Sequence, residues 1–363
     1  MPAKKTNDKK KKQTKKKGQP SLMKEETKVE EWISSGSVLL DAACSCHKSQ
    51  VGGFPTRRII EFSGTGGAGK SYICGEMAGD ALRKGYAVYV DDIERRWDLA
   101  RLSTFGFKYN NPKFHYIDPS SYIEECFQRL IDTLKKAKKG AKIIYIIDPV
   151  AALNSKIEVE GKSDKAGQSR AKAVQHYMRL LKEDMGRPDC TFIVVFSNQL
   201  IDNVMAGPFE EKKITPLGNA MIHWPSVRVR FTHIGKLTDK IVGRTGTEKD
   251  KVLNRGIKLK AVFKKNSEDD PFREIVISIA FGHGVDNIRD CARWLKKHTD
   301  CLGTTASGYE WPRRGQEPLI LNGIAKFVKF VESRNLEPML FKKTYKELKK
   351  WFEPVDRKPK VRY

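Results

Sequence analysis

The feature that most constrains the fold is a glycine-rich octapeptide at residues 64–71, which fits the pattern GxxxxGK[ST] without deviation. It follows a short apolar segment at 58–63 that is typical of a buried strand, and it precedes a helical pattern over 70–84. Strand, glycine-rich loop and helix in this order predict a phosphate-binding loop, because converging backbone N–H groups and the helix N-terminus attract phosphate oxygens. A glycine-rich turn that holds no nucleotide is the alternative.

Within this loop, two side chains have specific expected roles. We expect Lys70 to neutralise the β- and γ-phosphates of a nucleotide, and the Ser71 hydroxyl to ligate Mg²⁺. The residues expected to hold the nucleotide are Gly64, Thr65, Gly66, Gly67, Ala68, Gly69, Lys70 and Ser71.

Apolar segments alternate with helical patterns up to about residue 225. Near-continuous apolar runs are typical of strands buried on both faces, so we predict an α/β fold whose mostly parallel, twisted sheet carries helices on both faces. Beyond that point, alternating and more charged segments predict antiparallel strands, followed by a small C-terminal lobe. The expected strands are 58–63, 86–91, 114–118, 142–148, 190–197, 227–233, 257–264 and 273–281, and the expected helices are 70–84, 122–138, 165–184, 287–298, 322–334 and 342–351.

The charge is strongly unbalanced, with 69 Lys and Arg against 44 Asp and Glu, and points to a polyanionic partner, either nucleic acid or an anionic membrane surface. No apolar run is long enough for a membrane span, and the N-terminus lacks the apolar stretch of a signal peptide, so we expect a protein that is not secreted. Residues 1–20 hold nine Lys and one acid, which predicts a disordered basic tail. The tail is either a solubilising or nuclear-type patch or an arm that contacts phosphates.

The seven cysteines are scattered singly, so a disulfide framework is not expected. Cys44, Cys46 and His47 form the one cluster, which would be half of a metal site. Because no CxxC or HxxxH partner follows, we interpret the cysteines as structural thiols.

Two carboxylates follow expected strands. Asp148 ends the strand 142–148, at the sheet edge where ligands bind, and it suits a Mg²⁺-organising carboxylate; a turn-capping aspartate is the alternative. Glu94 follows the strand 86–91 and can take a proton from an attacking water. For this second assignment, a solvated acidic loop is the alternative.

The order of these features resembles the RecA-type recombinases of bacteria and phages. The likeness covers about residues 33–315, and its motifs occur in the order usual for that family. Pro149 stands where the family usually has Ser, and Leu217 replaces the first glycine of a GGNA motif. The matching segments are 35–41 (TGSxxLD), 58–71 (strand and phosphate loop), 92–98 (DxExxxD), 145–153 (Walker B strand), 196–199 (strand ending in Asn-Gln), 218–220 (GGNA) and 281–286 (YGxGI(N/D)).

The resemblance implies a RecA-type P-loop NTPase core that uses ATP and Mg²⁺. It assigns the catalytic glutamate to Glu94, an adenine-contacting acid to Asp98 and a γ-phosphate sensor to Gln199. Arg101 occupies the position of an adenine-stacking aromatic. The family's lysine that reaches a neighbour's ATP across a filament interface corresponds to Lys265, or as second choice Lys264, unless this is an ordinary basic strand end.

The resemblance also implies two DNA-binding loops, at 155–170 and 200–217. Basic side chains would contact phosphates, and an apolar wedge would separate stacked bases. Disordered surface loops are the alternative, and for Arg179 on the following helix a solvated helix face is equally favoured. The expected DNA-binding residues are Lys156, Lys162, Lys165, Arg170, Arg179, Met205, Phe209, Lys212, Lys213, Gly218 and Asn219.

We therefore expect a DNA-dependent ATPase that forms filaments on single-stranded DNA, pairs it with duplex DNA, and acts in the cytoplasm of a bacterial or phage-infected cell. A hexameric RecA-fold helicase and a non-catalytic recombination mediator are the rival functions. The N-terminal helix of the bacterial proteins is expected to be shortened to 24–33. The expected division is a basic tail (1–20), an interface segment (21–35), the ATPase core (36–285), a C-terminal α/β lobe (286–353) and a basic tail (354–363).

Overall fold

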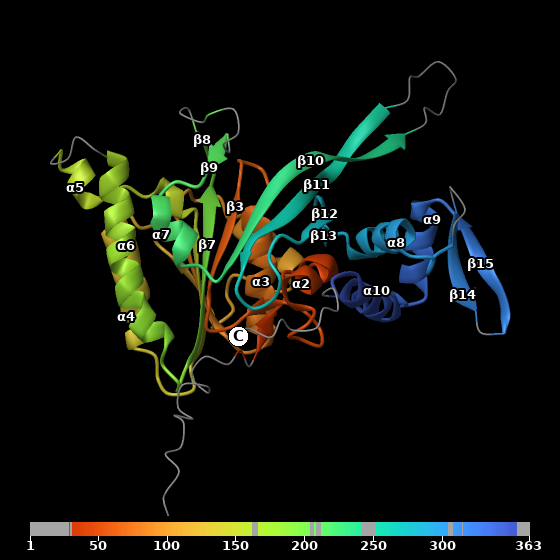
Figure 1. Ribbon diagram of the computed structural model, residues 1–363, viewed down its shortest axis with the longest axis horizontal. Helices are drawn as coiled ribbons and strands as arrows, with labels where there is room; N and C mark the ends of the chain where they lie inside the picture. Colours follow the sequence, from red (N-terminus) through yellow and green to blue (C-terminus); the bar gives the residue numbers. More distant parts are fainter. Residues whose placement is uncertain are drawn as a thin grey trace, which may run out of the picture.

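The computed structural model describes residues 29, 31–161, 166–203, 207, 212–241, 251–303, 308–313 and 315–353. In this part of the chain, one large sheet of nine strands carries helices against both faces (Figure 1). In order across the sheet, the strands are β13 (Gly284–Val285), β12 (Glu274–Ala280), β11 (Lys251–Asn266), β10 (Val227–Ile241), β3 (Ile59–Gly64), β7 (Thr191–Gln199), β6 (Lys142–Asp148), β4 (Ala87–Asp92) and β5 (Phe114–Ile117).

The strands from β10 to β5 are parallel, and β11, β12 and β13 continue the sheet in antiparallel pairing. This confirms the predicted mostly parallel sheet with an antiparallel extension. Because the carboxyl ends of parallel strands meet at one edge, the residues that follow β3, β4, β6 and β7 lie close together there.

Helices cover the two faces of the sheet as predicted. One apolar core lies under α4 (Ile123–Lys135), α6 (Ala166–Met185) and α7 (Gly218–His223), and the other under α2 (Val38–Ser45) and α3 (Lys70–Arg83). Neighbouring residues of β6 alternate between them, since Tyr145 belongs to the first core and Ile146 to the second. Each large apolar side chain buried in this way contributes about 1.5–3 kcal/mol to folding.

The C-terminal lobe contains the predicted helices, which are α8 (Asn287–His298), α9 (Ile324–Ser333) and α10 (Glu337–Trp351), at one end of the molecule in Figure 1. It also contains a hairpin that the sequence did not predict, formed by β14 (Gly308–Arg313) and β15 (Gln316–Asn322). Each of these strands contains a proline, Pro312 and Pro318, which weakens the strand signal in the sequence. The aromatic rings of Tyr309 and Trp311 pack on Phe327 of α9 and hold the hairpin in place.

Two other elements differ from the sequence-based expectation. The strands β10 and β11 are longer than predicted and project beyond the sheet as a two-stranded ribbon (Figure 1). The helix expected over 24–33 is wrong at its end, because β1 (Trp32–Ile33) pairs with β2 (Phe54–Pro55). Residues 24–28 and residue 30 of that segment lie outside the described residues.

Among the helices of the described residues, none has the length and apolar character that crossing a membrane requires.

Candidate nucleotide and DNA site

The glycine-rich loop connects the end of β3 to the start of α3. Gly69 caps α3 in a left-handed conformation, with φ 70°, which glycine adopts without strain. A Cβ atom on Gly69 would lie 2.8 Å from the side chains of Leu259 and Ile279, and a Cβ on Gly64 would lie 2.7 Å from the carbonyl oxygen of Phe231. Glycine is therefore required at both ends of the loop by conformation or close packing.

The loop forms one wall of a cavity of about 350 Å³. The cavity also receives Glu94 from the segment after β4, Asp148 from the end of β6, and Gln199 from the end of β7. Lys70 and Ser71, at the start of α3, complete this group of expected phosphate and metal contacts. These residues come from distant parts of the sequence, and the sheet topology brings them to one place.

Lys70 points back into its own loop. Its ammonium donates hydrogen bonds to the carbonyl oxygens of Gly64 at 3.1 Å and Thr65 at 2.9 Å. Burial lowers the pKa of Lys70, while the nearby Asp148 carboxylate opposes that shift. Because phosphate oxygens are stronger acceptors than carbonyl oxygens, a bound nucleotide would compete effectively for this ammonium.

The residues beside the loop fit a Mg²⁺ ion. The Ser71 hydroxyl and the carboxylates of Asp92 and Asp148 all line the cavity, and they are the hard oxygen ligands that Mg²⁺ prefers. One Asp92 oxygen, Oδ1, is buried and has no hydrogen-bond partner among the described residues. An orphaned carboxylate oxygen on a residue that lines the cavity is suited to interact with a cation or its water shell.

The two expected DNA-binding loops leave the same edge of the sheet. The first begins with a short helix, α5 (Lys156–Val159), which starts at a capping box between Ser155 and Glu158. Lys156 is exposed on this helix, whereas Arg170 on α6 forms an ion pair with Glu158 at 3.3 Å. Lys162 and Lys165 lie outside the described residues.

The second loop begins as a hairpin of β8 (Ile201–Asp202) and β9 (Lys213–Ile214), which Figure 1 shows at the same end of the molecule as α5. Lys212 and Lys213 are exposed there, and Lys213 pairs with Asp202 at 2.9 Å. Gly218 and Asn219 are exposed at the start of α7, where the loop closes. Met205 and Phe209 lie outside the described residues.

Arg179 is exposed on α6, roughly 20 Å along the helix axis from its first residue. The structure therefore does not bring it beside the start of α6, where the first loop ends. Its contact with DNA stays a prediction.

A polar network links Asn198, the neighbour of the cavity residue Gln199, to the base of the second loop. Glu61 of β3 accepts hydrogen bonds from Asn198 at 2.9 Å and from Arg228 of β10 at 2.5 Å. Arg228 also donates to the Thr215 hydroxyl at 3.3 Å, in the segment between β9 and α7. Asn198 precedes Gln199, the expected γ-phosphate sensor. The network therefore links the residue beside that sensor to Thr215, at the base of the second loop. The sequence did not predict this role for Glu61 or Arg228, because a charged residue in a strand carries no such signal.

Comparison with known proteins decides the family. A family model of the RecA N-terminal domain matches residues 4–286. The chain belongs to the RecA family. Proteins named Protein RecA are among its relatives: that of Cereibacter sphaeroides is 30% identical over 256 residues, which are 70% of this chain and 67% of the relative. That of Paracoccus denitrificans is 29% identical over 71% of this chain and 66% of the relative. That of Synechococcus sp. WH7803 is 28% identical over 81% of this chain and 69% of the relative.

RecA-family proteins are nucleotide-binding, DNA-dependent ATPases that act in homologous recombination, and this chain is a strand-exchange protein of that class. The fold and the family of this chain are therefore those that the sequence predicted. DNA binding and assembly into filaments are general properties of the family.

The adenine contacts expected of this RecA-family chain are not part of the cavity described above. Asp98 caps a 3-10 helix, η1 (Leu99–Phe105), by accepting a hydrogen bond from the Ala100 amide. It also pairs with Arg101 at 2.9 Å, and both side chains are largely exposed. Their contact with adenine stays a prediction.

The two candidate trans lysines also lie away from this chain's own cavity. Lys264 and Lys265 occupy the end of β11, where Lys265 is opposite Arg228 of β10. The Lys265 ammonium donates to the carbonyl oxygen of His223 at 2.6 Å. Burial lowers the pKa of Lys265, and the positive charge of Arg228 lowers it further. Action on a neighbour's nucleotide would require Lys265 to leave this intrachain bond.

Trp97 is a further site residue that the sequence did not identify. Its buried indole donates to Asp148 Oδ2 at 2.9 Å, and its backbone amide donates to Asp92 Oδ2 at 2.7 Å. Tyr116 also donates to the same Asp92 oxygen, at 2.8 Å. Trp97 thereby fixes both Asp148, the expected Mg²⁺ ligand, and Asp92, which the structure places beside it. A tryptophan in a charged segment gave no signal for this role.

We expect Trp97→Phe to raise the Mg²⁺ concentration needed for half-maximal ATP hydrolysis by about tenfold, because loss of a hydrogen bond to a charged group costs about 1.5–3 kcal/mol. The measurement is a Mg²⁺ titration of the ATPase rate. Trp311→Phe, in the C-terminal lobe, is the control for loss of a buried indole. If both variants lose thermal stability alike and keep the wild-type Mg²⁺ requirement, Trp97 acts in packing alone.

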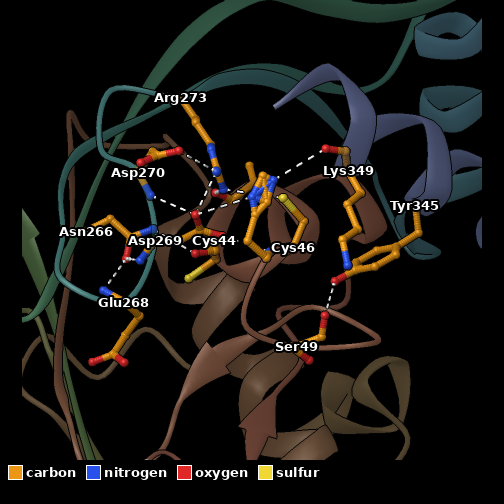
Figure 2. A network of polar contacts seen from close by, with 12 residues as sticks. Cys44, Cys46, Ser49, Asn266, Glu268, Asp269, Asp270, Arg273, Tyr345 and Lys349 are labelled. Carbon is orange, nitrogen blue, oxygen red and sulfur yellow. Dashed lines mark hydrogen bonds and ion pairs between the residues drawn. The ribbon is translucent and has the colours of Figure 1, made fainter. Parts of the chain in front are cut away.

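The cluster of Cys46, His47 and Asp269 has the ligand spacing of a metal site but contains a cation of its own (Figure 2). The buried guanidinium of Arg273 donates to Asp269 at 2.7 Å and to the Cys46 sulfur at 3.5 Å. Burial raises the pKa of Cys46 to about 11, so the thiolate that a metal needs is disfavoured. Beside this cluster, the Tyr345 hydroxyl donates to the Ser49 carbonyl at 2.9 Å and the His47 ring bonds to the Lys349 carbonyl at 3.4 Å, and these two contacts fasten α10 to the core.

The arrangement supports the interpretation of the cysteines as structural thiols. All seven are free: Cys301 is partly exposed and the others are buried.

Proposed function

We propose that this RecA-family protein binds ATP with Mg²⁺ in the cavity beside the glycine-rich loop and hydrolyses it in response to DNA. The observation that carries this proposal is the convergence of Lys70, Ser71, Glu94, Asp148 and Gln199 on one cavity. A phosphate cradle, a cation, metal-binding oxygens, a carboxylate base and an amide sensor are the parts that phosphoryl transfer needs.

In the proposed mechanism, the loop amides and Lys70 hold the phosphates. A Mg²⁺ ion held by Ser71 and Asp148, with Asp92 beside them, would supply charge neutralisation. Glu94 orients a water and accepts its proton as the water oxygen attacks the γ-phosphorus and the bond to the bridging oxygen of ADP breaks. Gln199 lies next to the loop, since a Cβ on Gly66 would be 3.8 Å from its Nε2 atom. It can therefore respond to the presence of the γ-phosphate.

We further propose that single-stranded DNA binds along the loops at 155–170 and 200–217, and that the resulting filament pairs this strand with duplex DNA. The net charge of +25 and the exposed Lys156 and Lys212 support the contact with a polyanion. In the filament, Lys265, or otherwise Lys264, would reach the nucleotide of the neighbouring subunit. We expect the protein to act in the cytoplasm of a bacterial or phage-infected cell, where its DNA substrates are.

The test is ATP hydrolysis with and without single-stranded DNA, combined with negative-stain imaging of the same samples. We expect hydrolysis to depend on DNA and open helical filaments to form with ATP. Closed rings would instead favour a hexameric helicase. Binding of ATP without hydrolysis in the presence of DNA would favour a mediator that only remodels partners.

A further inference from the structure

Arg96 is a second cation at the nucleotide cavity, and neither the motif nor the mechanism above uses it. It lines the cavity together with Lys70, Glu94 and Asp148. Its Nη1 atom lies 3.1 Å from Glu94 Oε2, so the guanidinium is paired with the carboxylate that is the proposed base. The Arg96 side chain is 70% exposed, whereas that of Glu94 is 27% exposed.

The backbone on both sides of this pair is held in place. Asp92, which precedes the pair at the end of β4, accepts a hydrogen bond from the Trp97 backbone amide. Trp97, which follows the pair, donates a hydrogen bond from its indole to Asp148. Between these anchors, Arg95 has φ 53°, in the left-handed region, and its amide donates to the Asp92 carbonyl in a tight turn. The turn directs both Glu94 and Arg96 to the cavity, and the largely exposed Arg96 side chain has room to change partners.

The charges in the cavity favour such a change when ATP is present. An ion pair whose arginine is 70% exposed contributes little to stability, because solvent screens the attraction between the two charges. A γ-phosphate carries more charge than a carboxylate and offers several oxygens to the planar guanidinium fork. Arg96 and Lys70 also line the same cavity of about 350 Å³. Both cations therefore act on the same small volume.

We infer that Arg96 distinguishes ATP from ADP at this site. It pairs with Glu94 when the γ-phosphate is absent and moves to the γ-phosphate when ATP binds. This inference rests on the proposed function, because it takes Glu94 as the base. Arg96 would then regulate the base. With ADP or without nucleotide, the Glu94 carboxylate is held in an ion pair with Arg96. With ATP, Arg96 moves to the γ-phosphate and the carboxylate is released to orient water.

The experiment compares the binding of ATPγS and ADP, each with Mg²⁺, to the full chain by calorimetry. Arg96→Ala should weaken ATPγS binding by about 10- to 100-fold, as expected for loss of a charged hydrogen bond. The affinity of Arg96→Ala for ADP should change by less than about twofold, because with ADP bound the substitution removes only the weak ion pair between Arg96 and Glu94. Arg96→Lys should recover only part of the ATPγS affinity, because it keeps the charge and loses the fork.

Arg95→Ala is the matched control, since Arg95 is the adjacent exposed arginine and is not among the residues that line the cavity. It should leave the ratio of ATPγS to ADP affinity at the wild-type value. An equal loss of affinity for both nucleotides in Arg96→Ala, or no loss for either, would overturn the inference. This binding ratio is read without hydrolysis, so it decides the role of Arg96 even if the wild-type protein shows no DNA-dependent ATPase and the proposed function fails.

Discussion

Replacing Glu94 by glutamine should leave ATP binding intact and slow DNA-stimulated hydrolysis by about 10²- to 10⁴-fold, the usual contribution of a positioned general base. The glutamine keeps the size of the side chain and its place in the cavity but cannot accept a proton from water. The measurement is the steady-state ATPase rate at saturating single-stranded DNA, together with the affinity for ATPγS. Because the substitution also removes the acidic partner of Arg96, ATPγS should bind at least as tightly as it does to the wild type.

Asp98→Asn is the matched control for Glu94→Gln, because it also replaces one acid of the same segment by its amide. Asp98 is exposed and caps η1, and it is expected to contact adenine. We therefore expect this control to raise KM for ATP while leaving kcat close to the wild-type value. A Glu94→Gln protein that hydrolysed ATP at the wild-type rate would take the role of base away from Glu94.

The parallel sheet could be predicted because its strands are nearly continuous apolar runs. The strand β6 was predicted with its observed bounds, Lys142–Asp148, since a strand buried on both faces carries an uninterrupted signal. The hairpin β14–β15 could not be predicted, because its prolines and short length hide the alternation of its apolar side chains. The extension of β10 and β11 beyond the sheet was missed for a related reason: Ile234, Lys236 and Thr238 are exposed in its described part, so burial imposes little pattern on the sequence there.

For the site, the sequence identified residues whose chemistry is tied to a motif and missed those whose role depends on position alone. Lys70, Ser71, Glu94, Asp148 and Gln199 were all named from the sequence, and all of them line the cavity. The residues that orient these side chains belong to no sequence motif. Trp97 reaches Asp148 only because the chain turns sharply after β4, and Arg96 meets Glu94 for the same reason. Contacts of this kind depend on the backbone path, which spacing in the sequence does not reveal.

Assembly tests a different part of the proposal, because the lysine expected to complete the site belongs to a neighbouring subunit. Lys265→Ala should bind ATP normally through its own glycine-rich loop and lose hydrolysis by about 10³- to 10⁵-fold, the effect of removing a trans cation in other phosphoryl-transfer enzymes. Within one chain, Lys265 bonds to the His223 carbonyl and is not among the residues that line the cavity, so a direct effect on its own nucleotide is not expected. The measurement is the ATPase rate with single-stranded DNA and, separately, the affinity for ATPγS.

Mixing Lys265→Ala with Lys70→Ala distinguishes a trans role from a cis role. In a mixed filament, some sites combine the intact loop of a Lys265→Ala subunit with the intact Lys265 of a Lys70→Ala neighbour. Those sites are complete, so the mixture should hydrolyse ATP although neither variant does so alone. If Lys265 acted on the nucleotide of its own chain, every site would lack one of the two lysines and no mixture would recover activity. Inactive mixtures that still polymerise together on DNA would therefore exclude the trans role of Lys265, and Lys264→Ala would then be examined in the same way.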